Sequence, residues 1–290
     1  HTDIKLVHTF HFSPLTNIKD YDDFKDRTIY DTNSRLKRFL KSIYIEVKRP
    51  LHYIIGKKRA KDRYGKYDLD NIDALTSINK KDCKLYKSMF PKQYRKKFHT
   101  IANPIILDNT PLKNEKENII LFVGRLTYQK RLDRLILVWK RIYKEHPTWK
   151  LIVLGSGDYS ERYQTMSKDL GLNNILFLGQ QPSEDYYKRS KILCMTSSDE
   201  SFGMVMVEAQ KFGCVPIAYN SFAAAEDIIE NGYNGLLIKP FKEKEYAKAL
   251  IKLMTEESYR ESLVANGPAF IDKFNIEIVI KDWINLLNNI

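Results

Sequence analysis

Two carboxylates, Glu200 and Glu208, stand on either side of a predicted strand-to-helix turn in the segment 198–209. Glu200 precedes a helix that we expect over residues 203–212, and Glu208 lies about a turn and a half inside it. A helix N-terminus binds anions through its free N–H groups and its macrodipole, and Gly203 lets a ligand approach the backbone closely. A diphosphate at this turn, with a carboxylate accepting hydroxyl groups on each side of it, would belong to a nucleotide sugar.

The same segment also fits a capped helix that binds no ligand. Ser198 or Ser201 can be an ordinary N-cap. Asp199 and Glu200 can be first-turn acids, and Glu208 can be a solvated helix residue. The spacing alone leaves both interpretations open.

Two cations follow an apolar run, residues 119–123, that we expect to be a buried strand of a parallel sheet. Arg125 and Lys130 lie between that strand and the next predicted helix, at the carboxyl edge where such sheets bind ligands. Two cations at this spacing can hold a diphosphate and stabilise it as a leaving group. An Arg and a Lys on a loop are also common as plain surface charges, so the pair is informative only together with the two carboxylates.

The carboxylate segment resembles a known motif. Glu200-Ser-Phe-Gly-x4-Glu208-Ala is similar to the E-x7-E motif of retaining glycosyltransferases, in particular glycosyltransferase family 4, which has the GT-B fold. The resemblance implies that Glu200 contacts the hydroxyls of the donor sugar as a catalytic residue, and that Glu208 binds the ribose of the nucleotide. It also implies that the diphosphate lies on the backbone amides of Phe202, Gly203, Met204 and Val205.

The cation segment resembles the same family. It begins with Gly124 and is similar to the pattern G-R-L-x3-K-G, which implies that Arg125 and Lys130 are catalytic residues on the donor phosphates. The Gly that usually follows the Lys is Arg131 here, a departure that bears on the turn and leaves the segment positively charged.

Other positions match the family more locally. His11 follows a predicted strand over residues 4–10, and the resemblance implies a catalytic position near the donor sugar. Gly155 lies on a loop that the family places under the donor, and Gly179 ends a strand that frames the base. The family's Gly-Gly-x-Pro-Glu segment is replaced by residues 221–227, which bears on recognition of the donor sugar. A loop histidine and Gly-rich turns also occur without any ligand.

Positive charge is concentrated in the first part of the chain. The net charge is +12, and residues 1–108 carry 24 Lys and Arg against 13 Asp and Glu, a net of +11. Such a part favours an anionic surface: lipid headgroups, a pyrophosphate-bearing acceptor or nucleic acid. We expect peripheral contact with an anionic membrane and no nucleic acid, because no aromatic stacking motif is present. A solvated basic face is the alternative.

The cysteines and the hydropathy bear on the compartment. Cys83, Cys194 and Cys214 have no paired spacing, so we expect them to be reduced. The sequence has no run of about 18 apolar residues, so no transmembrane helix is expected. These features indicate a cytoplasmic protein, and the basic first part adds the expectation of a peripheral contact at the inner face of the membrane.

The order of predicted elements indicates an α/β fold, because strands alternate with helices from residue 118 onward, as in a doubly wound parallel sheet. The resemblance implies a GT-B architecture, in which two Rossmann-like domains face a cleft. We expect an acceptor-side domain over residues 1–108, a nucleotide-sugar-binding domain over 109–275, and a helix over 276–290 that crosses back to the first domain. A basic helix is expected over residues 33–55.

The first domain is expected to be incomplete. The chain begins with His1, and its first predicted strand ends in a stretch that, in the resembled family, comes midway through the N-terminal domain. Soluble proteins avoid open apolar sheet edges, so further strands would lie upstream. On this expectation the chain alone binds UDP weakly and transfers no sugar, whereas a chain extended upstream is active.

These interpretations converge on a retaining glycosyltransferase that moves a sugar from a UDP-sugar to a cell-envelope glycan or a lipid-linked acceptor. No zinc spacing, Walker loop or nucleophile elbow is present, so we expect no metal and no cofactor besides the donor as co-substrate. Alternatives are another GT-B enzyme such as a phosphorylase, and a non-catalytic module that binds nucleotide sugar or nucleic acid. A dinucleotide-dependent oxidoreductase would need G-x-G-x-x-G at the Gly124 turn, which lacks it.

Overall fold

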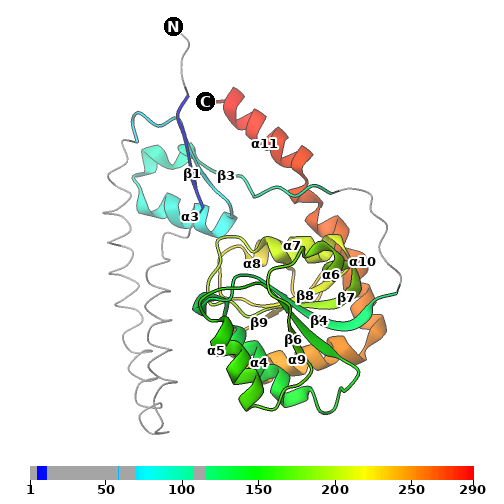
Figure 1. Cartoon of the computed structure of the whole chain (residues 1–290). Coiled ribbons are helices and arrows are strands. Elements are labelled where there is room, and N and C mark those ends of the chain that lie inside the picture. The colour runs from blue at the N-terminus through cyan, green and yellow to red at the C-terminus, as the bar shows by residue number, and fades with distance from the viewer. Residues whose placement is uncertain (1–4, 12–57, 59–68, 108–114) are drawn as a thin grey trace. The chain divides into compact units, whose positions relative to one another are not determined.

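The computed structural model describes residues 5–11, 58, 69–107 and 115–290 of the chain. The chain divides into two compact units, one of residues 1–102 with 282–290 and one of residues 103–281. Each unit is built on its own parallel sheet (Figure 1). The expected basic helix over residues 33–55 lies outside the described residues. Within the described ranges, none of the helices combines the length and the hydrophobicity that crossing a bilayer requires.

The second unit is organised around six parallel strands in the order β6-β5-β4-β7-β8-β9. Their bounds are β4 (Glu117–Val123), β5 (Lys150–Leu154), β6 (Ile175–Phe177), β7 (Ser190–Met195), β8 (Val215–Tyr219) and β9 (Leu236–Ile238). The central strands are buried along most of their length, as their continuous apolar runs predict. The strand order reverses between β4 and β7, and ligands of doubly wound sheets bind at such a reversal.

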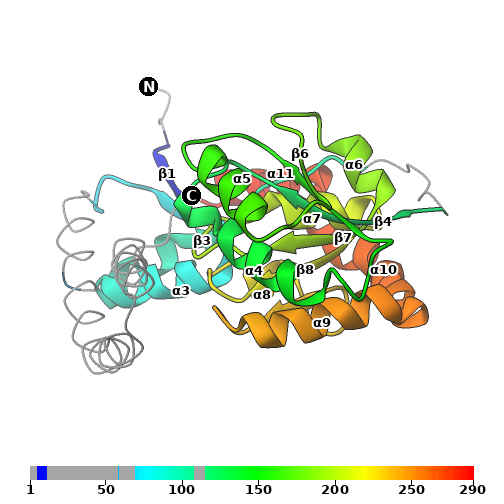
Figure 2. The ribbon, with the colours of Figure 1, turned by 60° about the horizontal axis from the view of Figure 1, so that its bottom comes forward.

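Helices cover both faces of this sheet, with α4, α5 and α9 on one face and α6, α7, α8 and α10 on the other (Figure 1, Figure 2). Their bounds are α4 (Leu132–Ile142), α5 (Ser160–Asp169), α6 (Glu184–Arg189), α7 (Met204–Lys211), α8 (Ala225–Ile228), α9 (Glu243–Thr255) and α10 (Glu257–Ile271). Helix α4 shows why they pack: Leu135, Ile136 and Trp139 recur at helical spacing and are fully buried. The predicted α/β fold with a doubly wound parallel sheet is confirmed.

The first unit has, in its described residues, a parallel sheet in the order β1-β2-β3. The strands are β1 (Val7–Phe10), β2 (Ala74–Ser77) and β3 (Phe98–Thr100), and α3 (Lys80–Met89) lies between the last two in the chain. Helix α3 begins after Asn79, whose side chain accepts a hydrogen bond from the N–H of Asp82 at 2.8 Å. Phe10 stacks on Tyr86 of α3 with ring centroids 4.2 Å apart, which packs the helix against the sheet.

Element ends are where prediction and structure differ. The strand expected over residues 4–10 begins at Val7, because its pairing with β2 begins at Ala74. Just before that pair, the N–H of Leu6 donates to the side chain of Asp73 at 2.8 Å instead of to a neighbouring strand. The helix expected over residues 203–212 is one residue shorter at each end, as α7 (Met204–Lys211), because Gly203 is its N-cap and Phe212 its C-cap. The last helix, α11 (Ile276–Asn288), begins at the predicted residue.

Candidate functional site

Three glycines follow the strands β4, β5 and β6 at the carboxyl edge of the sheet in the second unit. The N–H of Gly124 donates to the carbonyl oxygen of Leu154 at 3.0 Å, and the N–H of Gly155 donates to that of Gly179 at 2.7 Å. A Cβ atom on Gly155 would lie 2.0 Å from the carbonyl oxygen of Gly124, so the backbones can meet only at glycine. Gly124, Gly155 and the exposed Arg125 line a cavity of about 310 Å³ at this edge.

The centre of the candidate site is a contact between Lys130 and Glu200. Lys130 ends the 3₁₀ turn η2 (Tyr128–Lys130) after β4, and Glu200 lies on the loop after β7. The ammonium Nζ of Lys130 is 2.5 Å from Oε1 of Glu200, and the hydroxyl of Ser197 donates to the same oxygen at 2.6 Å. The two residues predicted from separate motifs therefore meet where the strand order reverses.

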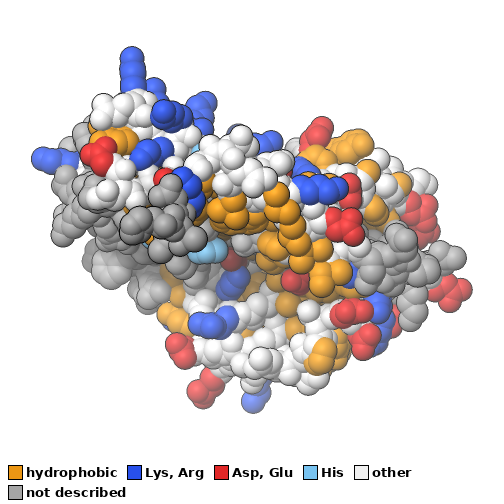
Figure 3. Space-filling model, turned by 90° about the horizontal axis from the view of Figure 1, so that it is seen from above, with side chains coloured by type: hydrophobic (Ala, Val, Ile, Leu, Met, Phe, Trp, Pro, Cys, Tyr) orange, Lys and Arg blue, Asp and Glu red, His pale blue; other side chains and the backbone are white. Residues whose placement is uncertain are grey.

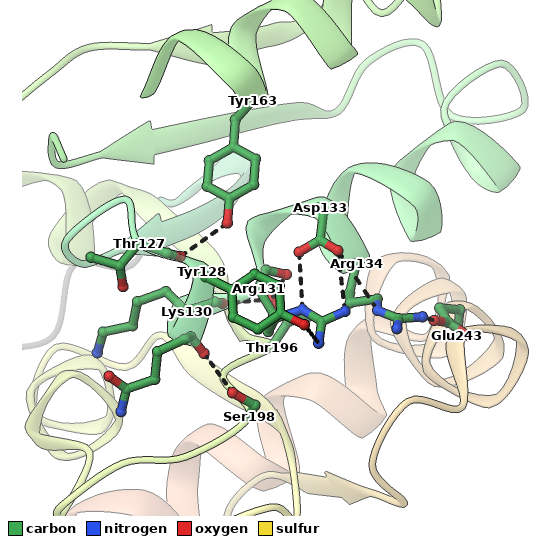
Figure 4. Close-up of polar contacts among 11 residues, drawn as sticks. Thr127, Tyr128, Lys130, Arg131, Asp133, Arg134, Tyr163, Thr196, Ser198 and Glu243 are labelled. Carbon is green, nitrogen blue, oxygen red and sulfur yellow. Dashed lines mark hydrogen bonds and ion pairs between the residues drawn. The ribbon is translucent and has the colours of Figure 1, made fainter. Parts of the chain in front are cut away.

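The loops after β4 and β7 are joined by hydrogen bonds that sequence reasoning missed (Figure 4). Ser198 donates to the carbonyl oxygen of Gln129 through its N–H at 2.9 Å and through its hydroxyl at 3.2 Å. The side-chain amide of Gln129 donates to the carbonyl oxygen of Asp199 at 2.8 Å. The hydroxyl of Thr196 donates to the carbonyl oxygen of Arg131 at 3.0 Å. Polar residues just after two predicted strands are the only sequence signal of this connection.

The start of α7 is not an ordinary capped helix, which corrects the alternative interpretation. The hydroxyl of Ser198 bonds to the loop after β4, and no described side chain caps the helix at its N-cap residue, Gly203. Gly203 has a φ of 97°, in the left-handed region that favours glycine. This start presents the amides of Met204 and Val205, whose side chains are half-buried.

Phe202 anchors the turn before α7. Its side chain is 2% exposed and meets the ring of Phe274 edge-on, with centroids 5.4 Å apart. Its side chain therefore belongs to the core, and only its backbone is left for the predicted contact with a diphosphate.

Glu208 is also more than a solvated helix residue. The hydroxyl of Tyr187, from α6, donates to Oε2 of Glu208 at 2.8 Å. Burial, and then the neighbouring charge of Glu208, raises the pKa of Tyr187 well above its ordinary value, so this phenol stays protonated and donates. The second carboxylate is therefore oriented by a neutral, buried partner that sequence reasoning did not identify.

The remaining predicted positions are placed as follows. Arg125 lies on the cavity and Lys130 pairs with Glu200. His11 is exposed just after β1 and belongs to the first unit, whereas the other predicted site residues belong to the second. Among the described residues, no group of three or more His, Cys, Asp or Glu side chains could hold a metal ion.

A doubly wound sheet with glycine turns and a cation–carboxylate pair at its switch point has the architecture of GT-B glycosyltransferases, and solved structures of that fold resemble this chain. The chain belongs to the family "Glycosyl transferases group 1", whose model matches residues 106–270.

Two curated relatives and one solved structure illustrate the similarity. The chain is 27% identical over 219 residues to GalNAc-alpha-(1->4)-GalNAc-alpha-(1->3)-diNAcBac-PP-undecaprenol alpha-1,4-N-acetyl-D-galactosaminyltransferase of Campylobacter jejuni, covering 74% of this chain and 60% of that protein. It is 26% identical over 260 residues to poly(glycerol-phosphate) alpha-glucosyltransferase of Bacillus subtilis, covering 88% and 38%. A crystal structure of a variant of S. aureus TarM, in complex with fondaparinux, alpha-GlcNAc-glycerol and UDP, has a TM-score of 0.70 at 21% identity, covering 80% and 46%. The chain thus spans less than two thirds of the length of these relatives.

Proposed function

We propose that the chain belongs to a glycosyltransferase of family 4, an enzyme that moves a sugar, with retention of the anomeric configuration, from a UDP-sugar to a cell-envelope glycan or a lipid-linked acceptor. Membership of glycosyl transferases group 1 supports the class of reaction. The names of the two relatives contain PP-undecaprenol and poly(glycerol-phosphate), which supports the class of acceptor. The UDP in the TarM complex supports the nucleotide.

The pairing of Lys130 with Glu200 is the observation that carries this proposal. An ammonium group that can take a phosphate oxygen and a carboxylate that can take sugar hydroxyls lie 2.5 Å apart, at the switch point of the sheet. A nucleotide sugar needs these two kinds of contact next to each other, because its sugar is attached directly to its diphosphate. The helix start at Gly203 adds backbone N–H groups for the same diphosphate.

The chemistry expected of these residues is stabilisation of a leaving group. The bond between the anomeric carbon and the diphosphate breaks, and its electron pair goes to the phosphate oxygen, where Lys130 and Arg125 stabilise the charge. The acceptor oxygen bonds to the anomeric carbon on the same face, and its proton passes to the departing phosphate. Glu200 orients the sugar through its hydroxyls, so the proposal needs no metal ion and no cofactor.

Glu208 is assigned to the ribose. Its carboxylate lies in the second turn of α7, with Oε2 bonded to Tyr187. A ribose presents two neighbouring hydroxyl groups, which a fixed anionic acceptor binds well. The Tyr187 hydroxyl fixes the direction of the carboxylate before any ligand binds.

The basic first part is assigned to a peripheral contact with anionic lipid. The turn η1 (Lys92–Lys97) carries Lys92, Arg95 and Lys96 as exposed side chains, while Lys97 donates internally to the carbonyl oxygens of two nearby residues. Figure 3 shows Lys and Arg side chains in blue on the face of the molecule that it draws. Sedimentation with anionic but not with neutral vesicles is the expected result, and equal sedimentation with both would exclude this contact.

The proposal is tested by a thermal-shift screen against nucleotide sugars, followed by calorimetry with UDP. We expect UDP and UDP-sugars to raise the melting temperature, and single-stranded nucleic acid to have no effect. A chain that binds nucleic acid and no UDP would instead be a nucleic-acid module. With the donor that stabilises most, NMR of the anomeric proton follows transfer to an acceptor, and an inverted product would exclude retention.

A further inference from the structure

Two residues other than glycine have a left-handed backbone among those that the structure describes. They are Arg131, with a φ of 51°, and Phe241, with a φ of 61°. A residue with a Cβ atom seldom adopts this conformation and keeps it only where its surroundings hold it there. The two residues are far apart in sequence, yet they touch: the guanidinium carbon of Arg131 lies 5.4 Å from the centroid of the Phe241 ring.

The side chain of Arg131 is buried and contacts other side chains of the protein (Figure 4). It is 2% exposed, and its guanidinium lies 4.7 Å from the centroid of the Tyr128 ring. Its Nε and Nη2 donate to the two carboxylate oxygens of Asp133 at 3.2 and 3.3 Å. Because the guanidinium is buried and forms a bidentate interaction with Asp133, it does not reach into the cavity near Gly124. The positive charge of Arg131, which stands where the resembled family usually has glycine, is therefore not available to bind the diphosphate.

The backbone of Arg131 sets the direction of Lys130. Arg131 is the junction between the 3₁₀ turn η2, which ends in Lys130, and helix α4, whose N-cap it is. Its N–H donates back to the carbonyl oxygen of Tyr128 at 3.1 Å, and its own carbonyl oxygen accepts from Arg134 at 3.0 Å. Helix α4 is fixed in the core by Trp139 and its neighbours. The torsion at Arg131 therefore decides where Lys130 points relative to a rigid helix.

Phe241 holds this junction from the loop between β9 and α9. Its ring also meets the guanidinium of Arg134 at 5.3 Å, and Arg134 forms an ion pair with Glu243 in the first turn of α9. The ring thus lies against two buried guanidinium groups, a favourable arrangement for an aromatic face. It connects the loop of Lys130 to an element more than 100 residues later in the sequence.

We infer that Arg131 is a positioning residue for Lys130, and that its contacts with Tyr128, Asp133 and Phe241 hold the left-handed junction that aims Lys130 at Glu200. The inference rests on the proposed function in one respect, namely that Lys130 binds the donor diphosphate. Arg131 acts through the backbone and touches no ligand.

The test is a double-mutant cycle on the affinity for UDP, measured by calorimetry on the whole chain. R131G removes the side-chain contacts while glycine still permits the left-handed backbone, so the variant can fold. We expect R131G to lower the affinity for UDP about fivefold in the wild-type background. In a K130A background the same change should alter the affinity less than about twofold. That result means that the effect of Arg131 passes through Lys130.

A second variant and a control keep the test decisive. F241G removes the ring at the other left-handed position. We expect it to lower the affinity for UDP only when Lys130 is present. F241G takes the place of R131G if R131G does not fold. Arg260 is a matched control: it is a buried arginine in α10 that pairs with Glu257 and donates to the carbonyl oxygen of Leu253. R260A should lower the melting temperature and leave the affinity for UDP unchanged.

The outcomes separate this inference from the proposed function. Should K130A itself leave UDP binding unchanged, both are overturned. Should K130A weaken UDP while R131G and F241G have no effect, or weaken UDP equally in both backgrounds, the assignment of Lys130 stands and the positioning role of Arg131 is overturned.

Discussion

The two ends of the segment 200–208 hold their carboxylates in different ways. Glu200 has a charged partner, Lys130, which comes from a loop 70 residues earlier in the chain. Glu208 has a neutral partner, Tyr187, which comes from the neighbouring helix α6 and lies 21 residues earlier. One end is an ion pair between two loops, and the other is a hydrogen bond between two helices.

This difference means that a ligand must rearrange the contact of Glu200, whereas the contact of Glu208 is fixed before a ligand binds. Tyr187 is 1% exposed and stacks on Phe212, so core packing fixes its hydroxyl. Lys130 is 20% exposed on a flexible stem, and an anionic ligand competes with Glu200 for its charge. A carboxylate held by a neutral phenol faces no such competition. The helix end is therefore preorganised, which lowers the cost of binding there.

Removing the cation of the Lys130–Glu200 pair should have the largest effect on the affinity for UDP. In K130A the diphosphate loses a charge-assisted contact of about 1.5–3 kcal/mol, so UDP should bind about tenfold more weakly or worse. Calorimetry measures this, with K150A as control, because Lys150 is exposed at the opposite, amino edge of the same sheet. Equal loss of affinity in both variants would mean that the effect is one of overall charge.

Neutralising the loop carboxylate, Glu200, should weaken binding of the sugar without weakening binding of the nucleotide. E200Q should bind UDP within about twofold of the wild type, while a UDP-sugar loses about fivefold, because only the sugar hydroxyls lose an anionic acceptor. Paired titrations with UDP and with the UDP-sugar of highest affinity give this ratio. A parallel fall for both ligands would show that Glu200 does not act on the sugar.

Neutralising the helix carboxylate should act on the nucleotide instead. E208Q should weaken UDP by about three- to fivefold, since the ribose hydroxyls lose the charged acceptor. The comparison with E200Q is the control, because both variants remove one charge from the same segment. If both lose UDP to the same extent, the division of roles along this segment is wrong.

Removing the buried phenol should have a smaller effect on binding. Y187F leaves Glu208 charged but less firmly oriented, so UDP should weaken about twofold and the free energy of unfolding should fall by about 1 kcal/mol. Y246F is the matched control: its buried hydroxyl donates to the carbonyl oxygen of Ile217, away from Glu208. It should lose similar stability with unchanged UDP affinity, as urea unfolding and calorimetry would show.

The smallest expected effect concerns the thiols that flank α7. Burial raises the pKa of Cys214 to about 12 and that of Cys194 well above its ordinary value, so both react slowly at pH 8. UDP at a concentration equal to its Kd should slow their alkylation about twofold, because it binds only the native second unit. Cys83, in α3 of the first unit, is the internal control and should not change. Peptide mass spectrometry would read all three, and protection of Cys83 alone would place the nucleotide in the other unit.

Local sequence signals predicted much of this architecture. Helix α7 lies within the predicted range 203–212, and the last helix, α11, begins at the predicted residue 276. The apolar run over residues 119–123 predicted β4, because the same apolar side chains that mark the run are the ones that the strand buries. Strand ends were less predictable, since pairing with a distant partner sets them, as at Val7 and Ala74.

The candidate site was predictable only as a set of positions. Motif resemblance singled out Glu200, Glu208, Arg125 and Lys130, and the structure brings two of them into contact. The donor to Glu208 could not be found this way, because Tyr187 lies in a helix whose pattern reads as ordinary packing. The torsion at Arg131 was equally hidden, since a left-handed arginine is held by contacts that no local pattern encodes.

The central pair also has a consequence for how the second unit refolds. Lys130 and Glu200 are brought together by the pairing of β4 with β7, whereas β4 pairs with β5 across a much shorter loop. Closing the longer loop costs more chain entropy before any contact rewards it, so this pairing is expected to lag behind the other. We therefore expect the site to be assembled late in refolding. After dilution from urea, recovery of secondary structure should precede the moment at which the chain can capture UDP.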